Sequence, residues 1–425
     1  MNKSLKILSV NVSDTSGGAA RAAYRIHRAV RTLGVDSRMF VKNKEKEDDS
    51  VLRVDDFDRK NIFSGIYRFV RHKIKNKLQH ARWNKYPRRE DVFLSDLRST
   101  SIHGALQKID YDVLHLHWIN LRFLDLKELT RVNKPIVWTL HDCWPFAGIC
   151  HYFYDCDQYK TNCGNCPFLH SGIEKDLSYR VWRRKKKFYT GLNLHIVTPS
   201  RWLAEAARQS SLFSGFPVTV IPNPIDTNLF SPRSRAEACT VLGLQPDKKY
   251  ILYGAINAIA DKRKGFIQLA EAFRVLEQQG SEQDIELLVM GADQPMEELK
   301  NSIPVTYLGY INSDEKMVSA YNAADLMVVP SLSENLSNVI MESLACGTPV
   351  VAFNIGGNSD MIEHQQNGYL AEAFSVDDLA EGILWCLEHN KDGRLSEDAR
   401  KKVEDNFSME KVAGEYSELY KSLVL

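Results

Sequence analysis

Hydrophobic residues in this chain gather in short runs of four to six, separated by longer stretches in which apolar residues recur at helical spacing. Short apolar runs that alternate with helical segments are typical of buried strands in parallel sheets covered by helices. In the first half the expected strands are 7–12, 113–118, 136–140, 194–198 and 218–221. In the second half they are 250–254, 286–290, 306–308, 326–329 and 350–353.

Two sets of alternating strands and helices predict two α/β domains of the Rossmann-like type. The run Pro222-Asn223-Pro224 breaks the pattern between them, so we place the linker near 222–232. The expected domains are 1–225 and 226–407, followed by a terminal helix over 408–425.

The charge of the chain is divided between these halves. The 425 residues carry a formal net charge of +1, but residues 1–225 hold 38 Lys and Arg against 22 Asp and Glu, and residues 226–425 hold 17 against 32. A basic half joined to an acidic half indicates domains with different partners, and the basic one should favour an anionic surface or substrate.

The first residues, Met1 to Lys6, contain no apolar leader region, and no window approaches the roughly 18 apolar residues of a spanning helix. We therefore expect a cytoplasmic protein, in which the eight cysteines form no disulfide framework.

The most informative stretch is 330–357, PSLSENLSNVIMESLACGTPVVAFNIGG. Glu334 and Glu342 lie eight residues apart, and Ser331 stands three residues before Glu334, which predicts a capping box at the start of a helix over 335–346. Such a helix start would offer free backbone N–H groups to a diphosphate. Alternatively, the stretch is an ordinary capped helix with two solvated carboxylates.

This stretch resembles the signature of the family 4 retaining glycosyltransferases, E-x7-E within "PS…E…E…GTPVV", and the resemblance covers nearly the whole chain. It implies the B-type glycosyltransferase fold, two facing Rossmann-like domains with the helix 408–425 crossing back to the first. It also implies that Glu334 contacts the hydroxyls of the donor sugar and Glu342 the ribose. Family members usually carry Gly-Phe-Gly after the first Glu, where this chain has Asn335, Leu336 and Ser337.

Three further motifs match the family. Lys264, before Gly265, matches the lysine that holds the donor diphosphate, and Arg263 is assigned as the accompanying arginine; a solvated basic turn is the alternative. Gly17 and Gly18 follow the first strand, where the family has a glycine loop, although a plain tight turn would look the same. His141 ends a predicted strand and matches the family histidine beside the donor sugar; a structural histidine is the alternative.

The resemblance also implies the reaction. The family retains the anomeric configuration without an obvious carboxylate nucleophile, by front-face attack of the acceptor hydroxyl while the leaving diphosphate takes its proton. Arg263, Lys264 and the helix start at 335–337 would stabilise the diphosphate charge, Glu334 would position the sugar, and no catalytic metal is needed.

Four cysteines form the least expected feature. Cys150, Cys156, Cys163 and Cys166 occur within 17 residues, in an insertion that we place at 143–170. Four thiolates suit a structural zinc ion, although buried free thiols or redox-labile thiols fit the sequence as well.

The segment 59–89 contains 11 Lys and Arg and no acidic residue, with apolar residues at helical spacing from Ile62 to Leu78. A second basic cluster covers 183–187. This composition is typical of a helix at an anionic membrane surface, whereas packing of the apolar face on its own domain is the alternative. Nucleic-acid binding is disfavoured because the aromatic residues are not interleaved as a stacking platform.

Taken together, these features predict a cytoplasmic enzyme, peripheral on the membrane, that transfers a sugar from a nucleotide-sugar donor to a glycan acceptor, lipid-linked, in the synthesis of a bacterial polysaccharide. The competing hypotheses are a sugar-nucleotide epimerase of the same fold and a binding protein without turnover. Neither the nucleotide, the sugar, nor the acceptor can be read from the sequence.

Overall fold

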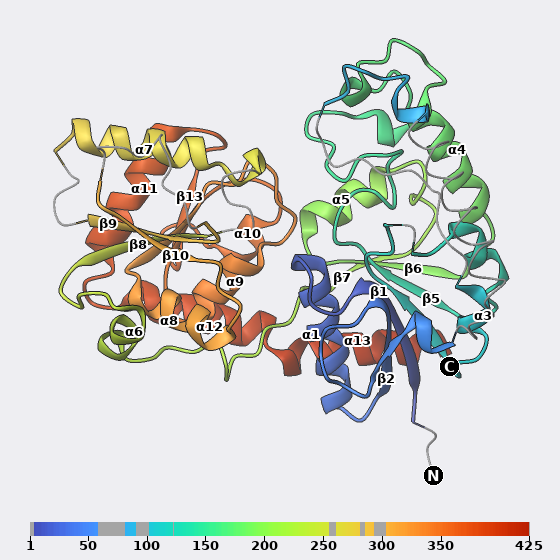
Figure 1. Ribbon diagram of the computed structural model, residues 1–425, viewed down its shortest axis with the longest axis horizontal. Coiled ribbons are helices and arrows are strands. Elements are labelled where there is room, and N and C mark those ends of the chain that lie inside the picture. The colour runs from blue at the N-terminus through green and yellow to red at the C-terminus, as the bar shows by residue number, and fades with distance from the viewer. Residues whose placement is uncertain are drawn as a thin grey trace. The chain divides into compact units, whose positions relative to one another are not determined.

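The computed structural model describes residues 4–57, 81–90, 102–121, 123–254, 261–280, 285–292 and 303–424. The chain forms two compact units (Figure 1), one of residues 1–221 with 414–425 and the other of residues 222–413. Each unit has a parallel sheet between helices, so the predicted class, two α/β domains of the Rossmann-like type, is confirmed. Each unit is described by itself below.

Unit 1 contains a sheet of seven parallel strands in the order β3-β2-β1-β4-β5-β6-β7. The strands are β1 (Lys6–Ser13), β2 (Asp36–Asn43), β3 (Val51–Arg53), β4 (Val113–Leu116), β5 (Ile136–Thr139), β6 (Leu194–Thr198) and β7 (Val218–Val220). The helices are α1 (Gly18–Thr32), α3 (His103–Leu106), α4 (Leu177–Tyr189) and α5 (Arg201–Gln209), with short 3-10 turns at Val54–Phe57, Leu126–Arg131, Gln158–Lys160 and Pro167–Leu169.

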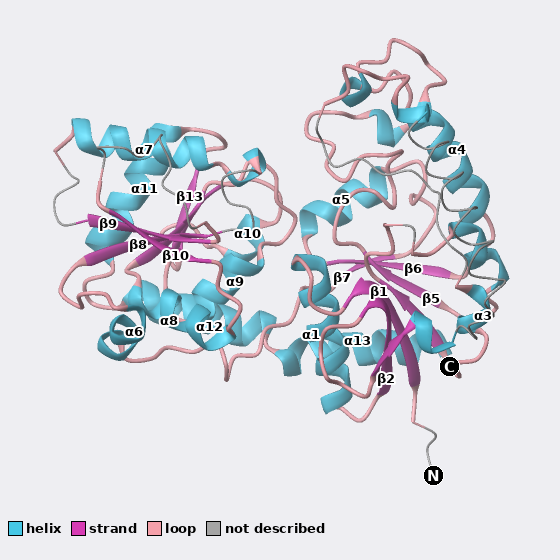
Figure 2. Ribbon diagram, in the orientation of Figure 1, coloured by secondary structure: helices cyan, strands magenta, loops and turns pink. Residues whose placement is uncertain are grey.

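Unit 2 contains six parallel strands in the order β10-β9-β8-β11-β12-β13 (Figure 2). They are β8 (Lys249–Gly254), β9 (Ile285–Met290), β10 (Val305–Gly309), β11 (Leu326–Val329), β12 (Val350–Phe353) and β13 (Gly368–Ala371). The helices are α6 (Arg235–Leu242), α7 (Phe266–Gln278), α8 (Asp314–Ala323), α9 (Asn338–Ala345), α10 (Asn358–Met361), α11 (Val376–His389) and α12 (Arg394–Phe407), with a 3-10 turn at Lys262–Lys264.

The terminal helix α13 (Met409–Val424) begins in unit 2, and its residues from Gly414 onward belong to unit 1. Tyr416 and Tyr420 are fully buried in unit 1. The Tyr420 hydroxyl lies 2.7 Å from His115 Nδ1, and the Tyr416 hydroxyl lies 2.9 Å from Thr139 Oγ1. Hydrogen bonds to β4 and to the end of β5 therefore hold this helix in place.

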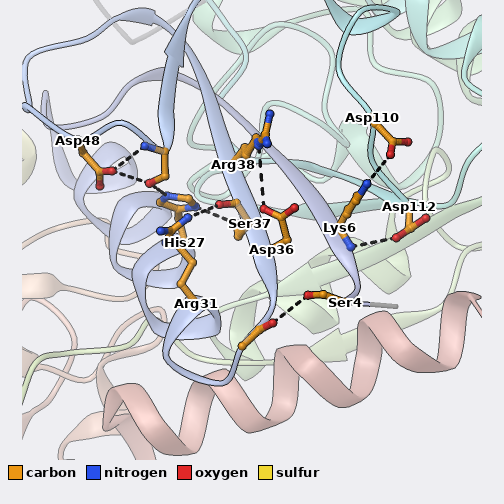
Figure 3. Close-up of polar contacts among 12 residues, drawn as sticks. Ser4, Lys6, His27, Arg31, Asp36, Ser37, Arg38, Asp48, Asp110 and Asp112 are labelled. Atoms are coloured by element: carbon orange, nitrogen blue, oxygen red, sulfur yellow. Dashed lines mark hydrogen bonds and ion pairs between the residues drawn. The ribbon is translucent and has the colours of Figure 1, made fainter. Parts of the chain in front are cut away.

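A buried histidine stabilises the edge of the unit 1 sheet where β2 and β3 pair (Figure 3). His27, on α1, is enclosed between two hydroxyls, with Nδ1 2.8 Å from Ser37 Oγ and Nε2 2.9 Å from Ser50 Oγ. Burial lowers the pKa of His27 to about 4, with Arg31 adding to the effect. The ring is therefore neutral at pH 7, and it joins α1 to β2 and to the residue before β3.

The strands β2, β3 and β13 were missed by the sequence reading. Val51–Arg53 and Gly368–Ala371 are only three and four residues long, and Asp36–Asn43 carries a polar or charged residue at five of its eight positions. Short or mixed segments carry a weak periodic signal, and here they pair at or next to the edges of the sheets. Within the described residues, no helix is both long enough and apolar enough to cross a membrane.

Candidate functional site

The predicted donor-site residues of unit 2 meet where β8 and β11 end. Lys264, in the turn before α7, places Nζ 2.9 Å from Oε2 of Glu334, which lies in the loop between β11 and α9. A backbone hydrogen bond of 2.7 Å from Leu332 N to Arg263 O joins the two loops a second time. Both loops follow the carboxyl ends of neighbouring strands, where parallel α/β sheets bind their ligands.

Two glycines allow this close approach of the loops. Gly265 has φ +69°, and a Cβ added to it would overlap the carbonyl oxygen of Pro330. Gly356 has φ +54°, and its Cβ would overlap the carbonyl oxygen of Glu334. Glycine is required at both positions, for space as well as for backbone conformation, so the juxtaposition of Lys264 and Glu334 depends on them.

Arg263 is held by Asp261, a residue that the sequence reading did not single out. Its Nε lies 3.0 Å from Asp261 Oδ1, its Nη2 pairs with Asp261 Oδ2, and its backbone N–H donates to the same carboxylate at 3.1 Å. Asp two residues before a turn residue is the usual sequence signal of such a cap. Both cations of the site therefore already have carboxylate partners, with which an incoming diphosphate would compete.

The predicted helix start was wrong. The helix α9 begins at Asn338 with Ser337 as its N-cap, not at Asn335, and no side chain makes a capping hydrogen bond there. Ser331 and Glu334 consequently form no capping box, and the two glutamates are not eight helical residues apart. Residues 335–337 lie instead in the loop before the helix, with Asn335, Leu336 and Ser337 all buried.

Glu342 lies inside α9 and is fully buried. Its Oε2 accepts a hydrogen bond of 2.9 Å from the hydroxyl of Tyr321, on α8. Tyr321 was not predicted as a site residue. A buried carboxylate needs such a donor because leaving it unsatisfied would be costly.

In unit 1, the first glycine motif begins a helix as expected. Gly17 is the N-cap of α1 with φ +89°, and Gly18 is the first residue of the helix. Among the described residues, no atom lies within 4 Å of a Cβ added to Gly17, so the backbone there is open to a close approach.

His141 follows β5 and is half-buried, and its Nε2 lies 3.1 Å from Nδ1 of His117, which follows β4. Burial lowers the pKa of His141 to about 4, and the nearby Asp142 acts weakly in the opposite direction. His141 is therefore neutral at pH 7 and can donate or accept a hydrogen bond. His117 Nε2 is buried without a hydrogen-bond partner in the described part of the chain.

Asp142, next in the chain, organises the surrounding loop. Its Oδ2 accepts hydrogen bonds from Trp118 Nε1 at 2.7 Å and from His151 Nδ1 at 2.6 Å, and its Oδ1 accepts from the backbone of Trp144 at 2.9 Å. Burial alone would raise the pKa of Asp142, but His151 and these hydrogen bonds outweigh it and hold the pKa below the usual value. The backbone that follows His141 is thereby fixed.

The four clustered cysteines line one small cavity in unit 1. Cys150, Cys163 and Cys166 are buried and Cys156 is half-buried, and all eight cysteines are free thiols. Burial raises the pKa of the Cys163 thiol to about 12 and that of Cys166 to about 11. Within the residues that the structure covers, no group of three or more His, Cys, Asp or Glu side chains is arranged to hold a metal ion. Zinc binding here stays a prediction.

The expected basic cluster 183–187 is not wholly at the surface, because one of its five cations, Lys185, is buried. It is fully buried, and its Nζ donates to the carbonyl oxygens of Trp144, Ala147 and Gly148 and lies 3.8 Å from the centre of the Trp144 ring. Burial lowers its pKa to about 7, opposed by the nearby Cys150, Cys163 and Asp142. Only the other four cations of the cluster remain for a surface role.

The basic amphipathic segment 59–89 falls mainly outside the described residues, which include only 81–89 of it. The apolar positions from Ile62 to Leu78 therefore have no structural account. Trp83 and Tyr86 are half-buried against the core of unit 1.

Comparison with solved structures identifies the class of fold. The chain matches sucrose-phosphate synthase from Thermosynechococcus elongatus with a TM-score of 0.65 and 20% identity, covering 99% of both chains. It matches HepE of Anabaena, in a complex with UDP-glucose, with a TM-score of 0.61 and 16% identity over 99% of this chain and 100% of that one. The fold is that of the B-type glycosyltransferases.

Family models narrow this class. The model "Glycosyltransferase Family 4" matches residues 16–229, about half of the chain, and the model "Glycosyl transferases group 1" matches residues 239–402. This chain belongs to glycosyltransferase family 4.

Two relatives found by sequence each cover part of the chain. The putative colanic acid biosynthesis glycosyl transferase WcaC of Escherichia coli K12 is 26% identical over 57% of this chain and 59% of that protein. A D-inositol 3-phosphate glycosyltransferase of Paenarthrobacter aurescens is 27% identical over 68% of this chain and 65% of its own length. The chain thus spans about three-fifths to two-thirds of the length of these two relatives.

Proposed function

We propose that this chain is a retaining glycosyltransferase that transfers a sugar from a nucleoside-diphosphate sugar to a lipid-linked glycan acceptor in polysaccharide synthesis. The observation that carries the proposal is the pairing of Lys264 with Glu334 at 2.9 Å, made possible by Gly265 and Gly356. A cation for a diphosphate and a carboxylate for sugar hydroxyls stand side by side at the carboxyl end of the sheet of unit 2.

The chemistry follows from these neighbours. Breaking the bond between sugar and diphosphate leaves negative charge on the diphosphate, and a cation already in place stabilises that charge more than it stabilises the intact donor. Lys264 and Arg263 would exchange Glu334 and Asp261 for diphosphate oxygens. Glu334 would then accept hydrogen bonds from the sugar, and backbone N–H groups at the start of α9 would add donors to the diphosphate.

His141 would contribute from unit 1 as a neutral ring. Because burial lowers its pKa to about 4, the ring is neutral at pH 7, and its role would be a hydrogen bond to the donor sugar or to the acceptor hydroxyl. His117 holds Nε2 of His141, and Asp142 fixes the backbone beside it. The leaving diphosphate would take the proton of the acceptor hydroxyl.

The relatives support the choice of substrates. HepE of Anabaena was solved with UDP-glucose, which favours a nucleotide sugar as the donor, and the WcaC relative is named for colanic acid biosynthesis, which favours a polysaccharide. A lipid-linked acceptor is supported by the excess of basic residues in residues 1–225.

The test is a binding and turnover screen with UDP-, GDP-, ADP- and dTDP-sugars, followed by variants. Lys264→Ala should weaken binding of the identified donor by about tenfold or more, because a charge-assisted contact is lost. Glu334→Ala should chiefly lower kcat. Lys262→Ala is the matched control, because Lys262 is an exposed cation of the same turn and pairs with no predicted ligand.

For the ribose site, Glu342→Gln is preferable to alanine, which would leave a cavity and remove the partner of Tyr321. We expect weaker donor binding with a normal melting temperature. If Lys264→Ala, Glu334→Ala and Glu342→Gln all keep wild-type transfer, the site is wrongly placed; if a donor binds and only its sugar is epimerised, the reaction is wrongly assigned.

A further inference from the structure

Unit 1 contains an open cavity of about 230 Å³, and the described charged residues that line it are all basic. It lies between the first turns of α4 and the segment 81–90. Its polar side chains are those of Arg82, Lys85, Tyr86, Arg180, Arg183 and Arg184, and its apolar ones are those of Leu177 and Val181. None of the described residues that line it is acidic.

The arginines of α4 form one face of this cavity. Arg180, Arg183 and Arg184 are three and four residues apart, so they project from the same side of the helix. Leu177, Val181, Trp182 and Lys185 are buried residues of the same helix, and Leu177 and Val181 also line the cavity. Like charges at this spacing repel each other and destabilise a helix, so the arrangement is not explained by the stability of α4.

Four of the cations that line the cavity are not neutralised by the described part of the chain. In the described part of the chain, no carboxylate pairs with Lys85, Arg180, Arg183 or Arg184. Arg180 Nε donates to the carbonyl oxygen of Lys175 at 3.2 Å, and Arg183 and Arg184 lie about 6 Å from the ring centres of Tyr179 and Phe188. The guanidinium groups are thus positioned, and none of the described carboxylates neutralises their charge.

The other wall of the cavity is fixed to α4. The hydroxyl of Tyr86 accepts a hydrogen bond of 3.0 Å from the backbone N–H of Leu177, the first residue of the helix. The backbone N–H of Glu90 donates to the carbonyl oxygen of Phe168 at 2.9 Å. Lys85 and Arg82 are therefore held opposite the arginines of α4.

We propose that this cavity binds the diphosphate of a lipid-linked acceptor. Several cations without carboxylate partners favour an anion with more than one charge, and guanidinium groups bind phosphate oxygens in a bidentate manner. Helices of parallel α/β units run opposite to their strands, so the first turns of α4 lie toward the carboxyl ends of β5 and β6, the edge of the sheet that also carries His141.

This inference rests on the proposed function for the identity of the acceptor, but its first test does not require transfer. Binding of inorganic pyrophosphate to the whole chain is measured by calorimetry in a Lys264→Ala background, which disables the donor diphosphate site. Arg180→Gln/Arg184→Gln should weaken this binding by about tenfold or more. The control Lys175→Gln/Lys187→Gln removes the same charge from exposed positions outside the cavity and should change binding by less than about twofold.

Vesicle binding distinguishes a lipid-linked diphosphate from ordinary anionic headgroups. Vesicles of a neutral lipid that contain a lipid diphosphate are compared with vesicles to which phosphatidylglycerol gives the same total charge. We expect the Arg180→Gln/Arg184→Gln variant, the cavity variant, to lose binding to the diphosphate vesicles only. Equal loss of binding to both kinds of vesicle would show that the cavity binds anionic headgroups in general and would overturn the assignment to a diphosphate. No pyrophosphate binding by the parent, or equal loss in the control variant, would overturn the cavity itself.

The last test measures the kinetics of sugar transfer. With a lipid-diphosphate acceptor, the cavity variant should raise the acceptor KM with unchanged kcat and unchanged donor KM. If no sugar is transferred by any form of the protein while pyrophosphate binding still depends on Arg180 and Arg184, the proposed function fails and the cavity assignment stands.

Discussion

At the scale of single residues, the site depends on where glycine allows backbones to touch. Lys264 and Glu334 are 70 residues apart in sequence, and they meet because Gly265 lies against Pro330 and Gly356 lies against Glu334. The cation and carboxylate were recognisable from sequence as members of a motif. The glycine contacts were not, because they depend on pairs of loops from different strands.

Gly265→Ala should therefore lower the free energy of unfolding by more than the positive φ of Gly265 alone would predict. Gly280 also has a positive φ, +64°, but no described atom lies within 4 Å of a Cβ added there. Gly280→Ala should cost about 1 kcal/mol for the left-handed backbone. Gly265→Ala should cost at least about 2 kcal/mol, because the overlap with Pro330 adds to the same backbone strain.

The measurement is the free energy of unfolding of both variants by denaturant titration. Equal losses at Gly265 and Gly280 would mean that the loops can separate without cost, and the contact would then not define the site.

At the scale of elements, five strands of the second half were predicted closely, whereas β13 and the start of α9 were not. Strands 326–329 and 350–353 have the predicted bounds because each is a buried apolar run. The capping box failed because Leu336 and Ser337 are buried in the loop before α9, and tertiary packing outweighed the local signal of Ser331 and Glu334. Lys185 was likewise predicted to be at the surface, because it stands in a run of five cations, but tertiary packing buries it.

The cysteine-lined insertion gives a prediction at this scale. If Cys150, Cys156, Cys163 and Cys166 ligate zinc, purified protein should contain about one zinc ion per chain, because four thiolates complete a tetrahedral site. Cys163→Ser should abolish the metal and lower the melting temperature, whereas Cys386→Ser, a buried cysteine of unit 2, should leave the metal content unchanged.

Elemental analysis of protein prepared without chelators decides the question. Metal-free protein in which all four thiols react with a thiol reagent after unfolding, and whose stability is unchanged by added zinc, would refute the zinc site and favour buried free thiols.

At the scale of the whole molecule, unit 1 carries a set of buried neutral histidines. Burial lowers the pKa of His27 to about 4 and that of His115 to about 3, and it also lowers the pKa of His117 and of His141. Between these values and the ordinary pKa of about 6.5, the unfolded chain binds protons that the folded chain does not. The free energy of unfolding should therefore be fully retained above about pH 6.5 and fall as the pH drops from there toward about 4.

His115→Gln should flatten this pH dependence, because glutamine does not titrate, while it can still hydrogen-bond to Tyr420 and Thr139. The control is His389→Gln, because His389 is exposed and belongs to unit 2. Melting curves of wild type and both variants from pH 4 to pH 8 are compared; parallel curves for all three would exclude the buried histidines as the cause of acid unfolding.

The proposed transfer of a sugar from a nucleotide donor, with retention at the anomeric carbon, is tested most directly by NMR of the product formed from the donor identified by the binding screen. We expect one glycosidic bond with the same anomeric configuration as the donor, and its loss in Glu334→Ala but not in Lys262→Ala. A product of inverted configuration, or an epimerised donor without transfer, would contradict it.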